Sequence, residues 1–202
     1  MSEHYYSKTQ KVESDPNYWD YNLKGYSFRF KTDNGVFSKK DVDFGSRLLI
    51  ETFVMPKPEG LVLDVGCGYG PIGLSIAKSF PDRTVHMVDV NERALALAKE
   101  NAAANSVNNV SIYESDRLLN VADLGFAAIL TNPPIRAGKT VVHDIFEQSF
   151  SLLVSGGELW VVIQKKQGAP SAIDKLKELY AEVETVEKKK GYCIIKAKKT
   201  LT

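Results

Sequence analysis

The sequence predicts an α/β protein with a doubly wound, mostly parallel sheet of seven strands that ends in an antiparallel hairpin. Two observations support this prediction. Between residues 61 and 181, short apolar segments alternate with amphipathic segments of helical period, a pattern typical of parallel strands joined by crossover helices. The last two strand-like segments, 182–187 and 191–197, are separated by little more than three lysines, and a connection this short forces an antiparallel pair.

The elements can be assigned one by one. Strands are predicted at 61–65, 84–89, 109–114, 126–131 and 157–164, and helices at 71–80, 91–104, 141–154 and 170–181. Upstream, aromatic and polar residues alternate over 26–30, which predicts a strand. The turn signal Asp33-Asn34-Gly35 then predicts a hairpin whose return strand begins at Val36-Phe37. A helix is expected around 44–54, ended by the proline-containing segment 55–60.

We expect two parts, an N-terminal extension with a β-hairpin over residues 1–40 and the main domain over 41–202. Residues 1–24 are polar and rich in tyrosine, without a period that predicts an element. This segment is therefore expected to pack through its aromatic side chains. A chain of 202 residues is long enough to bury a substantial core.

Composition narrows the class of protein. Apolar residues make up 44% and charged residues 25% of the chain, which is ordinary for a soluble globular protein. No apolar run approaches the ~20 residues of a membrane helix, and the N-terminus lacks a signal-peptide core, so we expect a cytoplasmic protein without membrane contact. Cys67 and Cys193 lie far apart, and no cluster of His or Cys accompanies them, so neither a disulfide nor a metal site is expected.

The net charge of +1 does not by itself indicate a protein that binds nucleic acid. Its distribution is uneven, because ten lysines stand against six acidic residues after residue 155. These lysines are either phosphate contacts or ordinary solvated surface.

A glycine-rich loop, Gly66-Cys67-Gly68-Tyr69-Gly70, follows the first core strand and opens a helix. Glycines at such a turn let a ligand lie against the main chain, which predicts a site for a nucleotide-type cofactor. Asp64, two positions before the first glycine, would repel a pyrophosphate and suits a ligand with an amino group. Gly68, Gly70 and Gly73 also fit the dinucleotide pattern, so the glycines alone leave an NAD-dependent dehydrogenase open.

Acidic residues follow the next two strands. Asp89 closes the strand 84–89, where a carboxylate can accept both hydroxyls of a ribose. Its alternative role is to cap the following helix, for which Asn91 is also available. Asp116 follows the strand 109–114, and is either within reach of an adenine amino group or a turn residue.

Asn132-Pro133-Pro134-Ile135 directly follows the strand 126–131. The prolines fix the backbone and have no N–H, so the Asn132 side chain and the Pro133 main chain present a row of carbonyl acceptors. Such a row suits an NH2 group, whose hydrogens it holds while the nitrogen lone pair faces an electrophile. An ordinary turn at the end of a strand would be enough to explain the Asn-Pro pair. The position of the whole motif beside the glycine loop instead predicts a site that acts on an amine.

The glycine loop, Asp89 and the Asn-Pro-Pro-Ile motif resemble those of class I S-adenosylmethionine-dependent N-methyltransferases. Segments 35–51, 132–139 and 156–169 are more closely similar to the small-subunit ribosomal RNA guanine-N2 methyltransferases. The resemblance covers roughly residues 25–198. It implies a class I methyltransferase, Rossmann-like fold and S-adenosyl-L-methionine as the cofactor. It also implies that the acceptor is the N2 amine of a guanine in 16S ribosomal RNA, with ribosomal RNA or the small ribosomal subunit as the partner.

The resemblance further implies roles for individual residues. The methionine and ribose end of the cofactor would be lined by Asp64, Gly66, Cys67, Gly68 and Gly70. The ribose and adenine would be held by Asp89, Val90 and Asp116. The cofactor would be covered by Phe37, Ser38 and Asp43. The acceptor pocket would be formed by Asn132, Pro133, Pro134 and Ile135, with Asn132 also contacting the cofactor.

Two features depart from the family pattern. Ile135 stands where many amino-methylating relatives carry an aromatic residue, so the base would be held more by its edge than by stacking. Other guanine-N2 members carry a second, degenerate domain before the catalytic one, and here only a short extension is expected.

Alternatives to this function stay open. The first is a methyltransferase with a different acceptor, either another exocyclic amine or a protein glutamine amide such as that of a release factor. The second is the NAD-dependent dehydrogenase, and the third is a non-catalytic RNA-binding module. Arg136, Lys139 and Lys165 flank the expected pocket, either as phosphate contacts or as ordinary loop charge.

Overall fold

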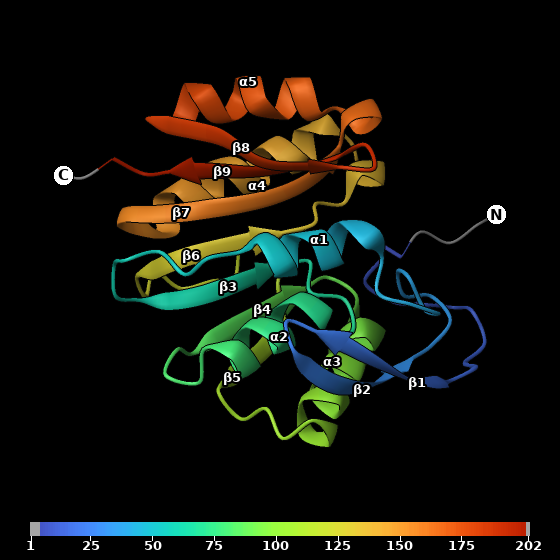
Figure 1. Ribbon diagram of the computed structural model, residues 1–202. Coiled ribbons are helices and arrows are strands. Elements are labelled where there is room, and N and C mark those ends of the chain that lie inside the picture. Colours follow the sequence, from blue (N-terminus) through green and yellow to red (C-terminus); the bar gives the residue numbers. More distant parts are fainter. Residues whose placement is uncertain (1–4, 201–202) are drawn as a thin grey trace.

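The computed structural model describes residues 5–200. In this part of the chain, a seven-stranded sheet forms the centre of the molecule and a two-stranded hairpin lies beside it (Figure 1). The strands of the hairpin are β1 (Asn17–Leu23) and β2 (Tyr26–Thr32), and those of the large sheet are β3 (Leu61–Val65), β4 (Val85–Asp89), β5 (Val110–Glu114), β6 (Phe126–Thr131), β7 (Leu153–Gln164), β8 (Glu182–Lys189) and β9 (Tyr192–Lys198). The helices are α1 (Phe44–Thr52), α2 (Pro71–Ser79), α3 (Glu92–Ala104), α4 (Lys139–Leu152) and α5 (Ala169–Leu179), with short 3-10 turns η1 (Ile135–Ala137) and η2 (Lys165–Gln167).

The strand order of the large sheet is β5-β4-β3-β6-β7-β9-β8. The first five strands in this order are parallel, whereas β9 is antiparallel to both β7 and β8. The predicted doubly wound, mostly parallel sheet with a terminal antiparallel pair is therefore confirmed. The chain moves outward in one direction from β3 and in the other from β6, so the switch point lies between these strands, where α/β sheets bind ligands at the carboxyl ends.

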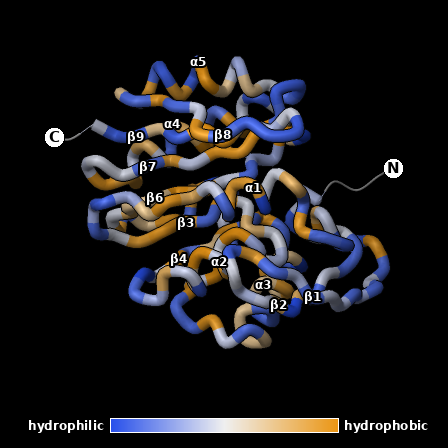
Figure 2. The backbone as a smooth tube through the Cα atoms, in the orientation of Figure 1, coloured by the Kyte–Doolittle hydropathy of each residue, from blue (hydrophilic) through white to orange (hydrophobic). Residues whose placement is uncertain are grey.

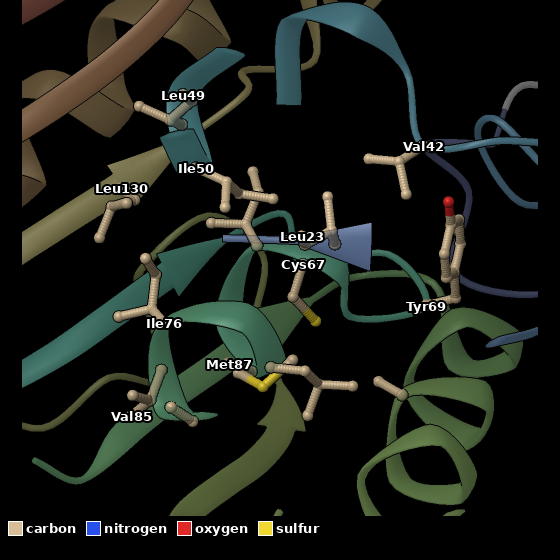
Figure 3. Packing of buried hydrophobic residues seen from close by; sticks show 14 of the residues in the cluster. Leu23, Val42, Leu49, Ile50, Cys67, Tyr69, Ile76, Val85, Met87 and Leu130 are labelled. Carbon is tan, nitrogen blue, oxygen red and sulfur yellow. The ribbon is translucent and has the colours of Figure 1, made fainter. Parts of the chain in front are cut away.

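Helices cover both faces of the sheet because its strands are apolar on both sides. In β3, Val62 points into the core under α1, α2 and α3, and its neighbour Leu63 points into the core under α4 and α5. Every residue of the central strand β6 is buried. Figure 2 shows the apolar residues along the central strands, and Figure 3 shows the first of these cores, which includes Ile76, Met87 and Leu130.

The N-terminal hairpin differs from the prediction. Its turn is Lys24-Gly25, where φ is 50° and 82°, as required by the two-residue turns that match strand twist. Asp33-Asn34-Gly35 joins no strands, and Val36-Phe37 lies in an irregular turn. The reason is that the carboxylate of Asp33 accepts the Ser14 hydroxyl (2.7 Å) and the Asp15 N–H (2.6 Å), which fix this segment as a loop.

Aromatic side chains attach the hairpin to the rest of the molecule. The rings of Trp19 and Phe30 pack edge-on against Tyr69, with centroids 5.8 and 5.6 Å away. The expectation that the N-terminal part packs through its aromatic residues is confirmed for the described residues. That part also contains the strand 17–23, which the sequence pattern does not indicate.

No helix in residues 5–200 is long and apolar enough to cross a membrane. Cys67 and Cys193 are both buried and unpaired. Across the same residues, no group of His, Cys, Asp and Glu side chains is arranged to hold a metal ion.

Candidate functional site

A cavity opens at the carboxyl ends of β3, β4 and β6, at the switch point of the sheet. Its empty space amounts to about 890 Å³, open solvent at the mouth included. Most of the predicted site residues line it, namely Phe37, Ser38, Asp43, Gly66, Cys67, Gly68, Asp89, Val90, Asn132, Pro133 and Pro134. The predicted residues that do not line it are Asp64, Gly70, Asp116 and Ile135.

The glycine loop between β3 and α2 forms one wall of the cavity. Gly66 and Gly68 have φ of +74° and +55°, a conformation that favours glycine, and a side chain at either position would meet no atom within 4 Å. The N–H groups of Gly66 and Cys67 donate to the Val88 carbonyl (2.8 and 2.9 Å), and that of Gly68 donates to Asp89 (2.8 Å). The loop therefore offers room for a ligand, but these three N–H groups are already occupied.

Asp89, the last residue of β4, presents a fixed carboxylate to the cavity. Its Oδ2 accepts the Gly68 N–H (2.8 Å) and its Oδ1 accepts the Asn91 N–H (2.9 Å). Burial raises the pKa of this carboxyl group, and the hydrogen bonds offset part of that rise. The cap of α3 is Asn91, whose side chain accepts the Ala94 N–H (3.1 Å), so Asp89 does not serve that role.

Asp64 lies under the glycine loop instead of in the cavity. Its Oδ2 accepts the N–H of Gly73 (2.8 Å), which is the third residue of α2, so it satisfies one of the N–H groups that a helix start leaves unpaired. Burial raises the pKa of Asp64 to about 7. Gly70 also serves α2 as its N-cap, with φ of +108°, and faces Leu74.

Asn132, which follows β6, is held by the first turn of α1. Its Nδ2 donates to the Oδ2 of Asp43 (3.2 Å) and to the Oγ of Ser46 (3.0 Å). Asp43 is the N-cap of α1 and accepts the Ser46 N–H through the same oxygen (3.0 Å). Because an ionised carboxylate only accepts hydrogen bonds, the NH2 side of the amide must face Asp43. The Oδ1 of Asn132 is left as an acceptor at the cavity wall.

The prolines after Asn132 form a tight turn. The Pro133 carbonyl accepts the Ile135 N–H (2.9 Å), and Pro134 between them has φ of −76° and ψ of 79°, the geometry of an inverse γ-turn. The Pro133 carbonyl, expected to be a free acceptor, is therefore engaged once, and its second lone pair remains for a ligand. The side chain of Ile135 packs against the core under α4 and α5 and forms no part of the cavity wall.

Two tyrosines near the N-terminus complete the cavity. Tyr5 and Tyr6 line it, and Asn91 holds their segment by donating from Nδ2 to the carbonyls of Tyr5 (2.9 Å) and Gly35 (3.0 Å). The Tyr6 hydroxyl donates to Asp116 (3.3 Å), and burial raises the pKa of Tyr6 to about 12. Residues on both sides of the predicted boundary at 40 thus line one cavity. The only sign of this wall in the sequence is the tyrosine pair itself.

Asp116 supports the wall from outside, where it pairs with Arg117 (3.1 Å). Arg117 lines the cavity and also pairs with Asp144 of α4. Two carboxylates therefore neutralise this cation, while Asp43 and Asp89 face the cavity, so the site favours a cationic ligand. The other lining residues, which were not predicted to belong to the site, are Ser46, Val65, Tyr69, Pro71, Ile72, Asn91, Ala94, Ser115 and Ile145.

A second, more open hollow adjoins the mouth of the cavity and shares Tyr5 and Ser38 with it. Its cations are Arg136, Lys39 and Lys40. Of the three cations expected to flank the acceptor pocket, Arg136 therefore lies at its mouth. Lys139 and Lys165 line neither hollow.

A sequence model of the methyltransferase small domain matches residues 27–196. The chain belongs to this family. An uncharacterized relative, YbxB of Bacillus subtilis, is 64% identical over 200 residues, which are 98% of this chain and 100% of the relative.

Two other relatives have named activities. The ribosomal RNA large subunit methyltransferase G of Pectobacterium atrosepticum is 29% identical over 94% of this chain and 51% of its own length. The ribosomal RNA small subunit methyltransferase C of Shewanella amazonensis is 34% identical over 82% of this chain and 48% of its own length. This chain thus spans about half the length of these two curated relatives.

Among solved structures, the T. thermophilus 16S rRNA N2 G1207 methyltransferase, in complex with AdoMet and guanosine, matches with a TM-score of 0.82. The match is 23% identical and covers 94% of this chain and 52% of that one. The class I methyltransferase fold expected from the sequence is confirmed by this likeness.

Proposed function

We propose that this chain is an S-adenosyl-L-methionine-dependent N-methyltransferase that modifies the exocyclic N2 amine of a guanine in 16S ribosomal RNA. The observation that carries the proposal is the orientation of Asn132, whose amide is fixed by Asp43 and Ser46 so that its carbonyl oxygen is left for an amine. Membership of the methyltransferase small domain family supports the reaction type. Relatives named as ribosomal RNA methyltransferases, and a structural neighbour that holds guanosine, support the acceptor.

The cavity suits S-adenosyl-L-methionine better than a dinucleotide. A pyrophosphate needs free N–H groups at the glycine loop, but those of Gly66, Cys67 and Gly68 are already bound within the protein. The carboxylates of Asp43 and Asp89 would repel phosphates and favour the cationic groups of S-adenosyl-L-methionine. These observations speak against the dehydrogenase.

The residues that would hold the cofactor follow from the cavity wall. When bound, S-adenosyl-L-methionine supplies an electrophilic methyl group on a sulfonium centre. Gly66 and Gly68 give it room against the main chain. Asp89 keeps a lone pair on each carboxylate oxygen for ribose hydroxyls, and Tyr5 and Tyr6 cover the opening.

The acceptor amine would be held by Asn132 and Pro133. The Oδ1 of Asn132 and the second lone pair of the Pro133 carbonyl accept the two hydrogens of the NH2 group, which orients its nitrogen. The nitrogen becomes cationic during transfer, and both carbonyl oxygens stabilise that charge. Orientation of the two reactants contributes about 7–11 kcal/mol relative to the bimolecular reaction. No strong base is needed, because the cationic nitrogen then loses its proton to water.

A flat nucleobase fits the mouth of the cavity better than a glutamine side chain does. Phe37 lies there with 45% of its surface exposed, and its ring packs against that of Tyr5 at 5.2 Å. This aromatic surface can stack on a base, a role that Ile135 does not fill. Flipping a paired base costs a few kcal/mol, so an unpaired guanine is the preferred target.

Methyl transfer from labelled S-adenosyl-L-methionine tests the proposal. Small and large ribosomal subunits from cells that lack this gene, naked 16S ribosomal RNA and a release factor are offered separately. The products are then digested to nucleosides or amino acids. We expect label in N2-methylguanosine from the small subunit or its RNA. Label in 23S ribosomal RNA, in another nucleoside or in glutamine would overturn the acceptor, and failure to bind S-adenosyl-L-methionine in calorimetry would overturn the reaction itself.

A further inference from the structure

One end of the β8–β9 hairpin carries lysines without an acidic partner. Five exposed lysines gather there, Lys165 and Lys166 of η2 and Lys188, Lys189 and Lys190 of the hairpin. No carboxylate among residues 5–200 forms an ion pair with any of them. At the other end of the hairpin, Lys196 pairs with Glu184 (3.0 Å) and Lys198 pairs with Glu182 (3.8 Å). The hairpin is therefore neutralised at one end and cationic at the other.

The cationic end lies at the edge of the sheet where the cavity opens. Gln164, the last residue of β7, pairs with Tyr192, the first residue of β9. The Lys165 N–H donates to the Gly191 carbonyl (2.8 Å), which joins η2 to the hairpin turn. Because β7 is parallel to β6 and β6 to β3, the turn lies at the carboxyl ends of all three strands (Figure 1).

Phe44, the first residue of α1, contacts one of these lysines and the neighbouring Arg47. Its ring centroid is 5.0 Å from the Lys190 Nζ and 5.3 Å from the Arg47 Cζ. The ring of Tyr192 packs against it at 5.4 Å. Two cations and two aromatic rings, drawn from α1 and from the hairpin, thus form one continuous surface.

This surface is fixed relative to the acceptor pocket. The first turn of α1 packs closely on Tyr192, so that a side chain at Gly45 would come within 2.7 Å of the Tyr192 Cε1. The same turn begins at Asp43, which binds the Asn132 amide. A ligand held on the surface would therefore lie at a fixed distance and orientation from the acceptor pocket.

We propose that the lysines of η2 and of the β8–β9 turn, together with Phe44 and Arg47, bind the phosphodiester backbone of RNA beside the nucleotide to be methylated. We call these residues the hairpin surface. Unpaired cations favour a polyanion, because each phosphate that they neutralise releases condensed counterions. The inference rests on the proposed function, since it names the surface by which the RNA acceptor reaches the pocket.

The test compares two double variants that remove the same charge from one hairpin. Lys189→Gln/Lys190→Gln alters the hairpin surface, and Lys196→Gln/Lys198→Gln alters the ion-paired end. Binding of a fluorescent 16S ribosomal RNA fragment is followed by anisotropy over about 50 to 200 mM salt. We expect the first variant to bind ~10-fold more weakly at low salt, with a slope of log affinity against log salt smaller by about 1 to 2. The control should stay within about two-fold of the unmodified chain.

Methyl transfer separates this inference from the proposed function. In the first variant the KM for RNA should rise, whereas kcat at saturating RNA and the affinity for S-adenosyl-L-methionine should stay unchanged, because Asn132 keeps its partners. Equal losses in both variants, or no loss in either, would overturn the hairpin surface. Weaker binding to intact subunits alone would also overturn it, by pointing to a ribosomal protein. If the surface binds RNA but no methyl group is transferred to RNA, the proposed function fails and the surface stands.

Discussion

The side-chain amide of Asn132 donates to the carboxylate of Asp43 across 3.2 Å, although the two residues are 89 positions apart in the sequence. The same carboxylate oxygen caps α1. The start of a helix and the orientation of the acceptor pocket therefore depend on one group. In the proposed reaction, Asp43 would act by positioning Asn132.

Substitutions of Asn132 and Asp43 should separate the contact with the acceptor amine from the positioning of Asn132 and the capping of α1. Asn132→Ala should lower kcat by about 100-fold, as expected when one group that stabilises developing charge is removed. Asp43→Ala should lower kcat by ~10-fold and the free energy of unfolding by ~1 kcal/mol, because the cap is lost as well. Asp43→Asn should retain most of the kcat and of the stability, because its single amide oxygen can accept from both the Ser46 N–H and the Asn132 Nδ2.

The double variant provides the control for this pair. If Asp43 acts through Asn132, the double alanine variant should have the kcat of Asn132→Ala alone in steady-state methyl transfer. Multiplying losses would instead show that Asp43 has a second role in the reaction.

Asp64 gives a pH dependence of stability. Its pKa is raised from 3.8 to about 7 in the folded chain, so between these values the folded state keeps a proton that the unfolded state has lost. The contribution of this group to stability therefore falls as the pH rises from about 4 to about 7. Asp64→Asn does not titrate, so the wild-type minus variant difference in free energy of unfolding should decrease over this window and then level off. Urea unfolding at a series of pH values measures it, and a constant difference would show that Asp64 is not responsible.

The sequence predicts those parts of the site that depend on local pattern. The pattern predicts Asp89 at the end of one recognisable strand and Asn132 directly after another, and parallel strands bring their carboxyl ends to one edge. The direction of a side chain is harder to predict. Asp64 and Ile135 belong to the predicted motifs, yet they face the core, because the start of α2 binds Asp64 and the γ-turn at Pro134 directs Ile135 inward.

Contacts between residues that are far apart in the sequence determine the conformation of the N-terminal part. Asp33-Asn34-Gly35 has the composition of a hairpin turn, but Ser14 and Asp15 bind its carboxylate. Tyr5 is brought to the cavity by Asn91, 86 positions away. No period or turn signal encodes such contacts, so sequence pattern alone does not reveal this wall of the site.

Asn91 should therefore control closure of the cavity. Asn91→Ser keeps a hydroxyl to cap α3 but loses the Nδ2 that donates to Tyr5 and Gly35. Amide hydrogen exchange should rise in residues 5–12 while α3 stays protected, and the affinity for S-adenosyl-L-methionine in calorimetry should fall by an order of magnitude. Unchanged exchange in residues 5–12 would show that other contacts hold the segment.

Gly66 and Gly70 both have positive φ, but their surroundings differ. A side chain at Gly66 meets open space, whereas one at Gly70 comes within 2.9 Å of the Leu74 Cδ1. Gly66→Ala should cost ~1 kcal/mol of stability for its left-handed backbone and should weaken binding of S-adenosyl-L-methionine strongly, because its methyl group occupies the space left for the ligand. Gly70→Ala should destabilise the chain more in urea unfolding, since core contacts must shift, while the folded fraction keeps its affinity. If Gly66→Ala bound the cofactor as tightly as the unmodified chain, the glycine loop would not be the wall against which the cofactor lies.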